Sequence, residues 1–392
     1  MTQAMTQAMT SIVILGAGYA GMATAMSLAG RTRRRSDVRV TLVNGSDRFT
    51  ERLRLHQIAS GQELADLRIP TLLAGTGVDL VRGWVTGIDV HAKKIRVDDE
   101  RVLPYDTLVY ALGATADTGA VPGAGELAYT LDSAHDAATL ARALPDLRTV
   151  AVCGSGLTGV EAAAELAERH PHLRVTLLGR QEPGARLTPK ARSYLDAALA
   201  RLGVQVRAGV EIEKVTPGGV EVADGATTEA DAVLWTGGVR VSPLAAAAGL
   251  RVDAHGRIVT DAALRSVSHP SVYAVGDAAA VRQGYGTMHG TCQGGMPTGA
   301  HAAASIAREL AGAAPKPFRF GYLHLPLSLG REDAVVQFTH PDDSPKRLYL
   351  TGKRAVWYKE TVSSSPWPSF RRLFTSPAVG MLGWRRGGRY TR

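Results

Sequence analysis

The chain lacks the features of a disulfide-stapled protein, a dithiol reductase and a membrane-spanning protein. Its 392 residues include two cysteines, Cys153 and Cys292, which form no CxxC or CxxxxC pair. A disulfide framework and a paired-thiol redox centre are therefore excluded, and we expect a reducing, cytoplasmic compartment. No apolar run reaches the roughly 18 residues that a spanning helix requires.

Signals for export, nucleic-acid binding and metal binding are also missing. Residues 1–10, MTQAMTQAMT, have neither the basic start nor the apolar stretch of a signal peptide, and we expect them to be a disordered leader. The formal charge of +9 favours an anionic partner such as a nucleotide or a membrane surface. Without a recognisable motif for either, we predict neither nucleic-acid binding nor a metal site.

A strand–turn–helix–strand unit near the N-terminus predicts a dinucleotide site. Residues 12–15 and 38–44 are apolar runs typical of buried parallel strands, and GAGYAG follows the first. Gly16 permits the tight turn, Gly18 lets backbone N–H groups approach a pyrophosphate, and Gly21 lets helix and strand pack closely. The phosphates would then face a helix N-terminus.

The same unit occurs a second time. Residues 149–166, TVAVCGSGLTGVEAAAEL, repeat residues 11–28, SIVILGAGYAGMATAMSL, glycine on glycine, and provide Gly154, Gly156 and Gly159. Each unit is followed by a β-rich stretch with Asp and Gly turns that ends in an apolar strand and small residues. Two such modules predict two dinucleotides that exchange electrons, a resident flavin and a visiting nicotinamide.

Neither module carries an acid at the position that normally binds the ribose. The second strand of the first module ends in Asn44, which can accept a weaker, neutral hydrogen bond. In the second module this position falls at residues 179–180, where Arg180 suits the 2′-phosphate of NADPH. We expect NADPH or NADH as electron donor, with NADPH favoured; the alternative is that Arg180 is a solvated surface residue.

Four segments give the chain a resemblance to the pyridine nucleotide–disulfide oxidoreductase superfamily. They are VILGAGYAGMATA, LVYALGA, VCGSGLTGVE and VYAVGDAAA, in matching order from residue 13 to residue 280. Within the superfamily, GLTGVE and the missing cysteine pair are similar to type II NADH dehydrogenases and related NAD(P)H:quinone oxidoreductases. The resemblance implies an α/β fold with two Rossmann-like, glutathione-reductase-like domains of three layers (ββα) and a C-terminal α+β region.

The duplication and the resemblance together predict the domain bounds. Residues 11–116 and 250–318 would form a discontinuous FAD-binding domain, and residues 117–249 the NAD(P)H-binding domain. Residues 319–392 would form a C-terminal domain with a basic, tryptophan-containing tail.

The resemblance also implies roles for residues around FAD, whose phosphates the glycines of the first turn would hold. Arg52 in FTERLRL resembles an arginine-bearing flavin loop, with a solvated helix residue as the alternative. Val85 in GWVTGID would meet the adenine through its backbone, and Gly113 would close the domain. Gly276 and Asp277 in VGDAA would bind the flavin ribityl chain; a strand that delivers a carboxylate at its carboxyl end also favours a ligand role.

The second module is expected to place the nicotinamide beside possible proton carriers. Its turn glycines would bind the dinucleotide, Gly238 would close the domain, and Glu161 would lie near the nicotinamide end. The alternative for Glu161 is a first-turn carboxylate that the helix dipole stabilises. His56 in ERLRLHQIASGQ would pass a proton to the reduced acceptor, with a polar residue on a packed helix as the alternative.

The segment GTMHGTCQGGMPTGAHAAASIAREL is expected to reach the reacting centre. Pro297 and Thr298 predict the start of a helix, whose positive end would stabilise a reduced flavin. Gln293 resembles the first glutamine of the quinone-site AQxxxQ motif of type II dehydrogenases, although Pro297 stands where the second would be. Cys292 is interpreted as a small buried residue, with a redox thiol as the alternative.

The end of the chain is basic and aromatic. Residues 361–392 contain six arginines and no carboxylate, and Trp357, Trp367 and Trp384 lie in or beside this segment. It would either lie in a membrane interface or pack on the flavin domain and cover the acceptor site. Prolines interrupt any long amphipathic helix there.

Together these patterns predict an FAD-dependent NAD(P)H oxidoreductase. Hydride would pass from nicotinamide to flavin, and electrons would then pass to a quinone or quinone-like acceptor. The alternatives are a flavin-dependent tailoring enzyme of specialised metabolism and an NAD(P)H-sensing flavoprotein. The protein would be cytoplasmic or peripheral on the inner face of the membrane, and a homodimer is left open.

Overall fold

Four strands from the first part of the chain and one from its second half form a parallel sheet around β1. The structure is a computed structural model that describes residues 9–378, so most of the expected leader lies outside the described residues, and Thr10 already belongs to β1. The middle strands are buried on both faces, as their uninterrupted apolar sequences predict. Across the sheet the strands are β19 (Val272–Ala274), β7 (Thr107–Tyr110), β1 (Thr10–Leu15), β2 (Val38–Asn44) and β3 (Val78–Arg82).

A second parallel sheet repeats this order. Strand β10 takes the central place of β1, with β11 and β12 on one side and β16 on the other. Its strands are β12 (Gln205–Ala208), β11 (Arg174–Gly179), β10 (Thr149–Cys153), β16 (Ala232–Trp235) and β9 (Ala128–Tyr129). The prediction of two dinucleotide-binding modules in an α/β fold is confirmed.

Each module carries an antiparallel three-stranded sheet, inserted between β3 and β7 in the first and between β12 and β16 in the second, which supplies the expected extra layer. The first such sheet consists of β4 (Val85–Asp89), β5 (Lys94–Val97) and β6 (Arg101–Pro104). The second consists of β13 (Ile212–Thr216), β14 (Gly219–Val222) and β15 (Thr227–Glu229).

The two modules are joined by a pair of crossing strands. β8 (Ala114–Ala116) leaves the first module and pairs antiparallel with β17 (Val239–Val241), which leaves the second. Gly113 and Gly238 precede these strands with φ of +67° and +68°, a left-handed conformation that favours glycine. The same turn therefore ends both modules and leads the backbone of each into the connecting strands.

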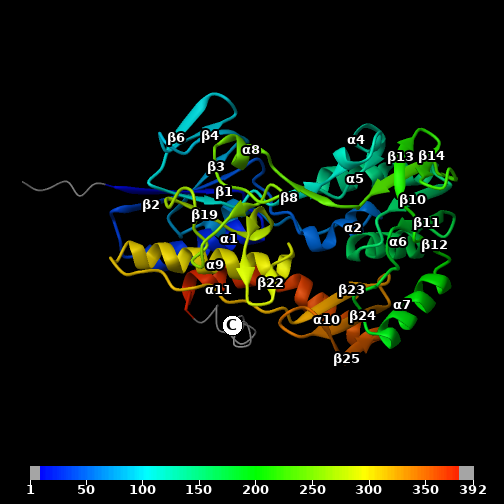
Figure 1. Cartoon of the computed structure of the whole chain (residues 1–392). Helices are drawn as coiled ribbons and strands as arrows, with labels where there is room; N and C mark the ends of the chain where they lie inside the picture. The colour runs from blue at the N-terminus through cyan, green and yellow to red at the C-terminus, as the bar shows by residue number, and fades with distance from the viewer. Residues whose placement is uncertain (1–8, 379–392) are drawn as a thin grey trace, which may run out of the picture.

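Helix α1 (Tyr19–Thr32) packs against both α9 (Cys292–Glu309) and α11 (Pro366–Thr375), so that segments far apart in sequence lie together (Figure 1). A Cβ on Gly299 would stand 2.1 Å from the carbonyl oxygen of Ala20, so only glycine permits this approach of α9 to α1. The prediction that a helix starts at Pro297 and Thr298 is wrong. Thr291 caps α9, and Pro297 lies inside the helix, where its missing N–H costs one hydrogen bond.

The remaining short elements complete the two modules. The helices are α2 (Leu55–Ala59), α3 (Ile69–Leu73), α4 (Ala124–Leu127), α5 (Ala134–Ala143), α6 (Leu157–Arg169), α7 (Pro189–Arg201) and α8 (Leu244–Ala247), with 3-10 turns η1 (Arg52–Arg54), η2 (Thr118–Ala120), η3 (Leu144–Asp146) and η4 (Gly276–Ala278). The short strands are β18 (Ile258–Val259), β20 (Ala279–Ala280), β21 (Arg282–Gln283) and β22 (Gly286–Thr287).

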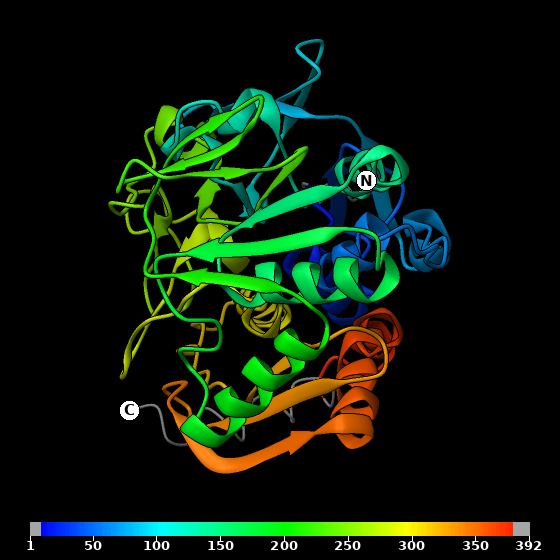
Figure 2. The ribbon, with the colours of Figure 1, turned by 90° about the vertical axis from the view of Figure 1, so that its right-hand side faces the viewer.

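The C-terminal region is the expected α+β unit. It consists of the antiparallel strands β23 (His324–Ser328), β24 (Ala334–Thr339) and β25 (Pro345–Thr351), followed by α10 (Gly352–Ser364) and α11. Its sheet lies beside α7 of the second module (Figure 2). Gln337 of β24 accepts hydrogen bonds from Thr188 just before α7, which ties the two together.

The described part of the tail packs on the first module. Phe370 of α11 is fully buried, and its ring lies 5.4 Å from that of Phe49, which Trp367 also contacts at 5.7 Å. Up to residue 378, the tail thus packs on the first module, which is one of the two interpretations given above. Trp384 lies outside the described residues. Within residues 9–378 no helix is both long and apolar enough to cross a membrane.

We expect Gly299→Ala to destabilise the protein by about 1–3 kcal/mol, because the added methyl group forces α9 away from α1. The urea midpoint of unfolding measures this. Gly218→Ala is the matched control, since a Cβ there meets no atom within 4 Å. Equal midpoints for the two variants would contradict the tight helix contact.

Candidate active site

The first glycine turn has no room for side chains where its backbone folds back on itself. Gly16 has a φ of +92°, and a Cβ on Gly21 would stand 1.8 Å from the carbonyl oxygen of Gly16. A Cβ on Gly18, in contrast, would meet nothing within 4 Å. The turn is therefore closed behind and open in front, where the N-terminus of α1 offers backbone N–H groups to an anion.

The second turn has the same geometry. Gly154 has a φ of +122°, and a Cβ on Gly159 would stand 1.8 Å from the carbonyl oxygen of Gly154. The space in front of Gly156 is again open within 4 Å. Both turns fit a pyrophosphate at the start of a helix, α1 in one module and α6 in the other.

The two ribose positions differ in what occupies them. Asn44 uses its side-chain oxygen to accept a hydrogen bond of 2.9 Å from Ala17 N–H in the first turn, and donates one of 2.7 Å to Ser46 O. At the end of β11, a Cβ on Gly179 would collide with Ser155. Arg180, exposed beside this position, lies 3.6 Å from Glu211.

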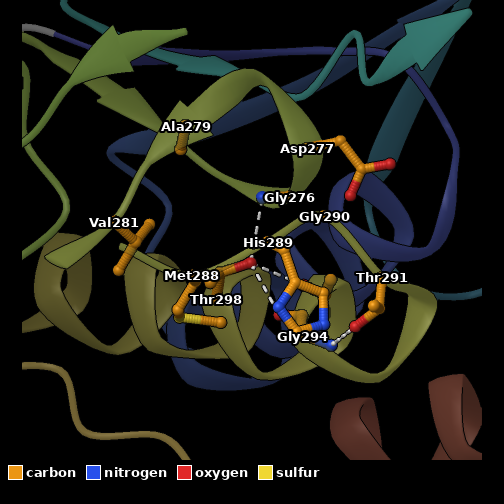
Figure 3. Close-up of a pocket in the computed structure, with 11 residues that line it drawn as sticks. Gly276, Asp277, Ala279, Val281, Met288, His289, Gly290, Thr291, Gly294 and Thr298 are labelled. Carbon is orange, nitrogen blue, oxygen red and sulfur yellow. Dashed lines mark hydrogen bonds between the residues drawn. The ribbon is translucent and has the colours of Figure 1, made fainter. Parts of the chain in front are cut away.

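A carboxylate without a hydrogen-bond partner lies in a pocket beside the first turn (Figure 3). Asp277 follows β19, and its carboxylate has no such partner among residues 9–378; burial raises its pKa, which nearby Arg52 partly offsets. Gly276, with a φ of +66°, donates its N–H to Thr298 Oγ1 at 3.0 Å, which anchors the turn on α9. A half-buried carboxylate of this kind fits a hydroxyl-bearing ligand such as a ribityl chain.

Arg52 is an exposed residue of η1, so both interpretations of it stay open. Its guanidinium lies 3.7 Å from Asp132 of the second module. Its charge also lowers the pKa of Asp277 against the effect of burial. Arg52 thus lies between the Asp277 pocket and the neighbouring module.

The first turns of α1 and α9 lie against each other beside this pocket. A Cβ on Gly295 would be 3.6 Å from Tyr19 Cβ, in the first turn of α1. The positive ends of two helices therefore converge, which favours negative charge on a ligand. Cys292 starts α9, and burial with the nearby Asp277 raises the pKa of its thiol to about 12, so it is unsuited to thiolate chemistry.

Strand β23 brings two of the predicted catalytic residues to its opposite ends. Gln293 donates to His324 O at 3.0 Å and accepts from Leu323 N–H at 2.7 Å, which holds it at the start of the strand. Glu161 accepts from Ser328 N–H at 3.0 Å at the end of the strand. At about 3.3 Å per residue the two anchor points are about 13 Å apart.

A buried ion pair stands beside the end of β23. Lys359 of α10 is 4% exposed, and its Nζ lies 2.6 Å from Glu161 Oε1 and 3.4 Å from Pro326 O. Burial alone would raise the pKa of Glu161, but the charge of Lys359 and the hydrogen bonds from Lys359 and Ser328 hold it below its usual value. Glu161 is therefore more than a first-turn carboxylate on a helix dipole.

His56, the third predicted catalytic residue, completes this group. Its Nδ1 lies 3.9 Å from Glu161 Oε2, and its buried Nε2 has no hydrogen-bond partner among the described residues. Burial lowers the pKa of His56 to about 4, against the opposing charge of Glu161, so the ring is neutral at pH 7. We call Glu161, His56 and Lys359 the β23 cluster; Gln293 lies apart from it, at the other end of the strand.

Sequence reasoning missed Lys359 and His324. Lys359 is one of many basic residues near the C-terminus, and no local pattern marks it as buried. His324 Nδ1 lies 2.7 Å from the hydroxyl of Tyr358, next to Lys359 in the chain. Burial and the charge of Lys359 lower the pKa of His324 to about 4. Only the packing of α10 on β23 brings these residues together.

Other predicted residues lie away from this cluster. Val85 starts β4, an edge strand of the first antiparallel sheet, and Arg180 lies at the carboxyl end of β11. These positions belong to the nucleotide ends of the two modules. Among residues 9–378 no group of three or more His, Cys, Asp or Glu side chains is arranged to hold a metal ion.

We expect His56→Gln to make the protein less sensitive to acid. In the unfolded chain His56 takes up a proton near pH 6.5, whereas in the folded protein its pKa is about 4. Between these two values protonation favours the unfolded state, so the free energy of unfolding decreases as the pH is lowered. Between pH 7 and pH 4 the free energy of unfolding of the variant should therefore fall by up to about 3 kcal/mol less than that of wild type. Urea midpoints at several pH values measure the difference.

The exposed residue His255 provides the control, because His255→Gln should leave the acid sensitivity unchanged. If His56→Gln and His255→Gln retain the same slope of midpoint against pH as wild type, His56 is not buried as a neutral ring.

Comparisons with known proteins agree with this geometry. The family model described as pyridine nucleotide-disulphide oxidoreductase matches residues 10–306. An NADH dehydrogenase-like protein of Mycobacterium tuberculosis is 31% identical over 383 residues, with 91% of this chain and 94% of the relative covered. A type II NADH:quinone oxidoreductase of Staphylococcus haemolyticus is 28% identical over 418 residues, with 98% and 100% covered. The solved sulfide:quinone oxidoreductase of Aquifex aeolicus superposes with a TM-score of 0.78 at 19% identity, with 94% and 93% covered.

Proposed function

The chain belongs to the pyridine nucleotide-disulphide oxidoreductase family, and from this membership we propose that it is an FAD-dependent NAD(P)H oxidoreductase that reduces a quinone or quinone-like acceptor. The observation that carries the proposal is the pair of glycine turns with one geometry, each closed behind and open in front. One turn for a resident flavin and one for a visiting nicotinamide is the arrangement that electron transfer between two dinucleotides requires.

The residues of the first module would hold FAD. The turn of Gly16, Gly18 and Gly21 would bind its phosphates, and Asp277 its ribityl hydroxyls. Bound there, the flavin would supply two-electron chemistry between nicotinamide and acceptor. The converging N-termini of α1 and α9 would favour its anionic reduced form.

The β23 cluster would supply the proton that the reaction needs. Reduction of a quinone to a quinol takes two electrons and two protons, whereas NAD(P)H provides two electrons and one proton as hydride. One proton must therefore come from solvent through the protein. Lys359 Nζ carries protons in the buried pair with Glu161, and the unpartnered Nε2 of His56 can accept or donate one.

Rapid mixing of the purified flavoprotein with NADPH or NADH, followed by menadione, tests the function. Fast bleaching of the flavin and fast reoxidation by the quinone are expected. Binding of NADPH with slow reduction of the flavin would favour the NAD(P)H-sensing flavoprotein. Fast reduction of the flavin without reoxidation by any quinone would favour the tailoring enzyme. A purified protein that binds no FAD would overturn the proposal.

We expect the double variant Glu161→Gln with Lys359→Met to slow reoxidation by menadione about a hundredfold while flavin reduction by NADPH proceeds normally. Removing both charges avoids the unpaired buried carboxylate that Lys359→Met alone would leave. Separate rapid-mixing measurements of the two half-reactions check this. Lys353→Met, an exposed change on the same helix, should alter neither half-reaction.

We further propose that NADPH is the preferred donor. The end of β11 provides Gly179 and an exposed Arg180 where NADH-binding modules carry an acid, and the exposed Glu211 3.6 Å away leaves the guanidinium open to solvent and to a 2′-phosphate. Arg180→Asp should shift the ratio of kcat/KM for NADPH over NADH toward NADH by about tenfold or more. Arg174→Asp, at the opposite end of β11, should leave the ratio unchanged; an equal effect would indicate only a general loss of positive charge.

Peripheral contact with a membrane and a homodimer also remain proposals. Trp357 of α10 and Leu348 of β25 are exposed on the C-terminal region, 70% and 60% respectively, and the basic residues Lys353 and Arg354 are exposed on α10. Apolar and basic side chains of this kind suit an anionic lipid interface.

A further inference from the structure

We propose that Trp84 is the stacking surface for the adenine ring of FAD. The indole would form one wall of the adenine subsite at the end of the first module. This rests on the proposed function, since it requires FAD in the first module, and it assigns the residue that grips the adenine half of the cofactor.

Trp84 is exposed to a degree that is unusual for tryptophan. Its exposed fraction is 73%, against 5% for Trp235. A large indole usually buries most of its surface, and a flat aromatic face left open is typical of a binding surface. Trp357 is equally exposed, at 70%, but lies on α10 in the C-terminal region.

The indole of Trp84 lies on the backbone of Gly45. A Cβ on Gly45 would stand 2.6–2.9 Å from three atoms of the indole ring, so the ring rests where any other residue would place its side chain. Gly45 directly follows β2, at the carboxyl edge of the parallel sheet. Ligands of open α/β sheets bind at this edge, and the outer face of the indole is free to meet one.

Hydrogen bonds link Trp84 to the phosphate turn through one residue. Asn44 accepts from Ala17 N–H of the first glycine turn through its side chain, at 2.9 Å. Its main-chain oxygen accepts from Gly83 N–H, next to Trp84, at 3.0 Å. The turn that would hold the pyrophosphate follows β1, Asn44 ends β2 and Trp84 follows β3, so the turn and the aromatic ring lie in order along one edge of the sheet.

The main chain of Trp84 is fixed by two hydrogen bonds. Its backbone N–H donates to Asp98 Oδ1 at 2.8 Å, and its main-chain oxygen accepts from Asp98 N–H at 2.9 Å. The next residue, Val85, starts the edge strand β4, and edge strands keep part of their peptide groups unpaired. A stacking face and peptide groups for the polar edge of the base therefore stand side by side.

The second module lacks this device. After β12 the corresponding residues are Gly209 and Val210, and Val210 is partly buried against the core of its own module. A stacked purine is bound more tightly than one without an aromatic partner. The difference matches a cofactor that stays in the first module and one that leaves the second.

Titration of the full-length protein, freed of flavin, with FAD and with FMN tests the proposal. Trp84→Ala should weaken FAD binding about tenfold to a hundredfold, the range for loss of one base–aromatic stack. FMN binding should be unchanged, because FMN has no adenine. Trp84→Phe should recover most of the FAD affinity, and Trp357→Ala should match wild type.

Accessibility of the indole gives a second readout. The difference in tryptophan fluorescence between wild type and Trp84→Phe reports on Trp84, and FAD should protect that emission from acrylamide. Unchanged FAD affinity in Trp84→Ala, or continued quenching of Trp84 in the FAD-loaded protein, would overturn the proposal and leave the proposed function intact. A wild-type protein that binds neither FMN nor FAD would instead remove the proposed function.

Discussion

One steric constraint underlies the whole architecture: at two places a helix returns so close to the turn before it that no side chain fits between them. A Cβ on Gly21 or on Gly159 would stand 1.8 Å from the carbonyl oxygen of Gly16 or Gly154. This closeness sets the position of α1 over β1 and of α6 over β10, and it points both helix N-termini at open space. Fold and ligand site therefore depend on the same backbone approach.

The C-terminal region turns the two modules into a single site. Strand β23 anchors Gln293 at one end and Glu161 at the other, while α10 delivers Lys359 between them. A buried ion pair is a weak source of stability, because desolvation offsets much of the attraction. Under the proposed function, its place where three parts of the chain meet suits the transfer of a proton to the acceptor.

The glycine turns, the parallel strands and the antiparallel inserts could be predicted because each depends on local sequence. The start of α9 could not, since Pro297 suggested a boundary and the Thr291 cap six residues earlier is a weak signal. Lys359 was missed for a different reason: its burial depends on how α10 packs on β23, and a lysine in a basic segment looks solvated. The ion pair that Lys359 forms with Glu161 could therefore not be predicted either.

The sequence alone determined the duplicated dinucleotide modules, the absence of a redox cysteine pair and the residues of both glycine turns, because steric limits on the backbone act within a few residues. Tertiary structure decided which side chains share a buried environment. The ion pair of Glu161 and Lys359, the unpartnered His56 Nε2 and the indole of Trp84 on Gly45 each join residues whose meeting depends on long-range packing. Charge and hydrogen bonding respond to that environment, and no local pattern contains it.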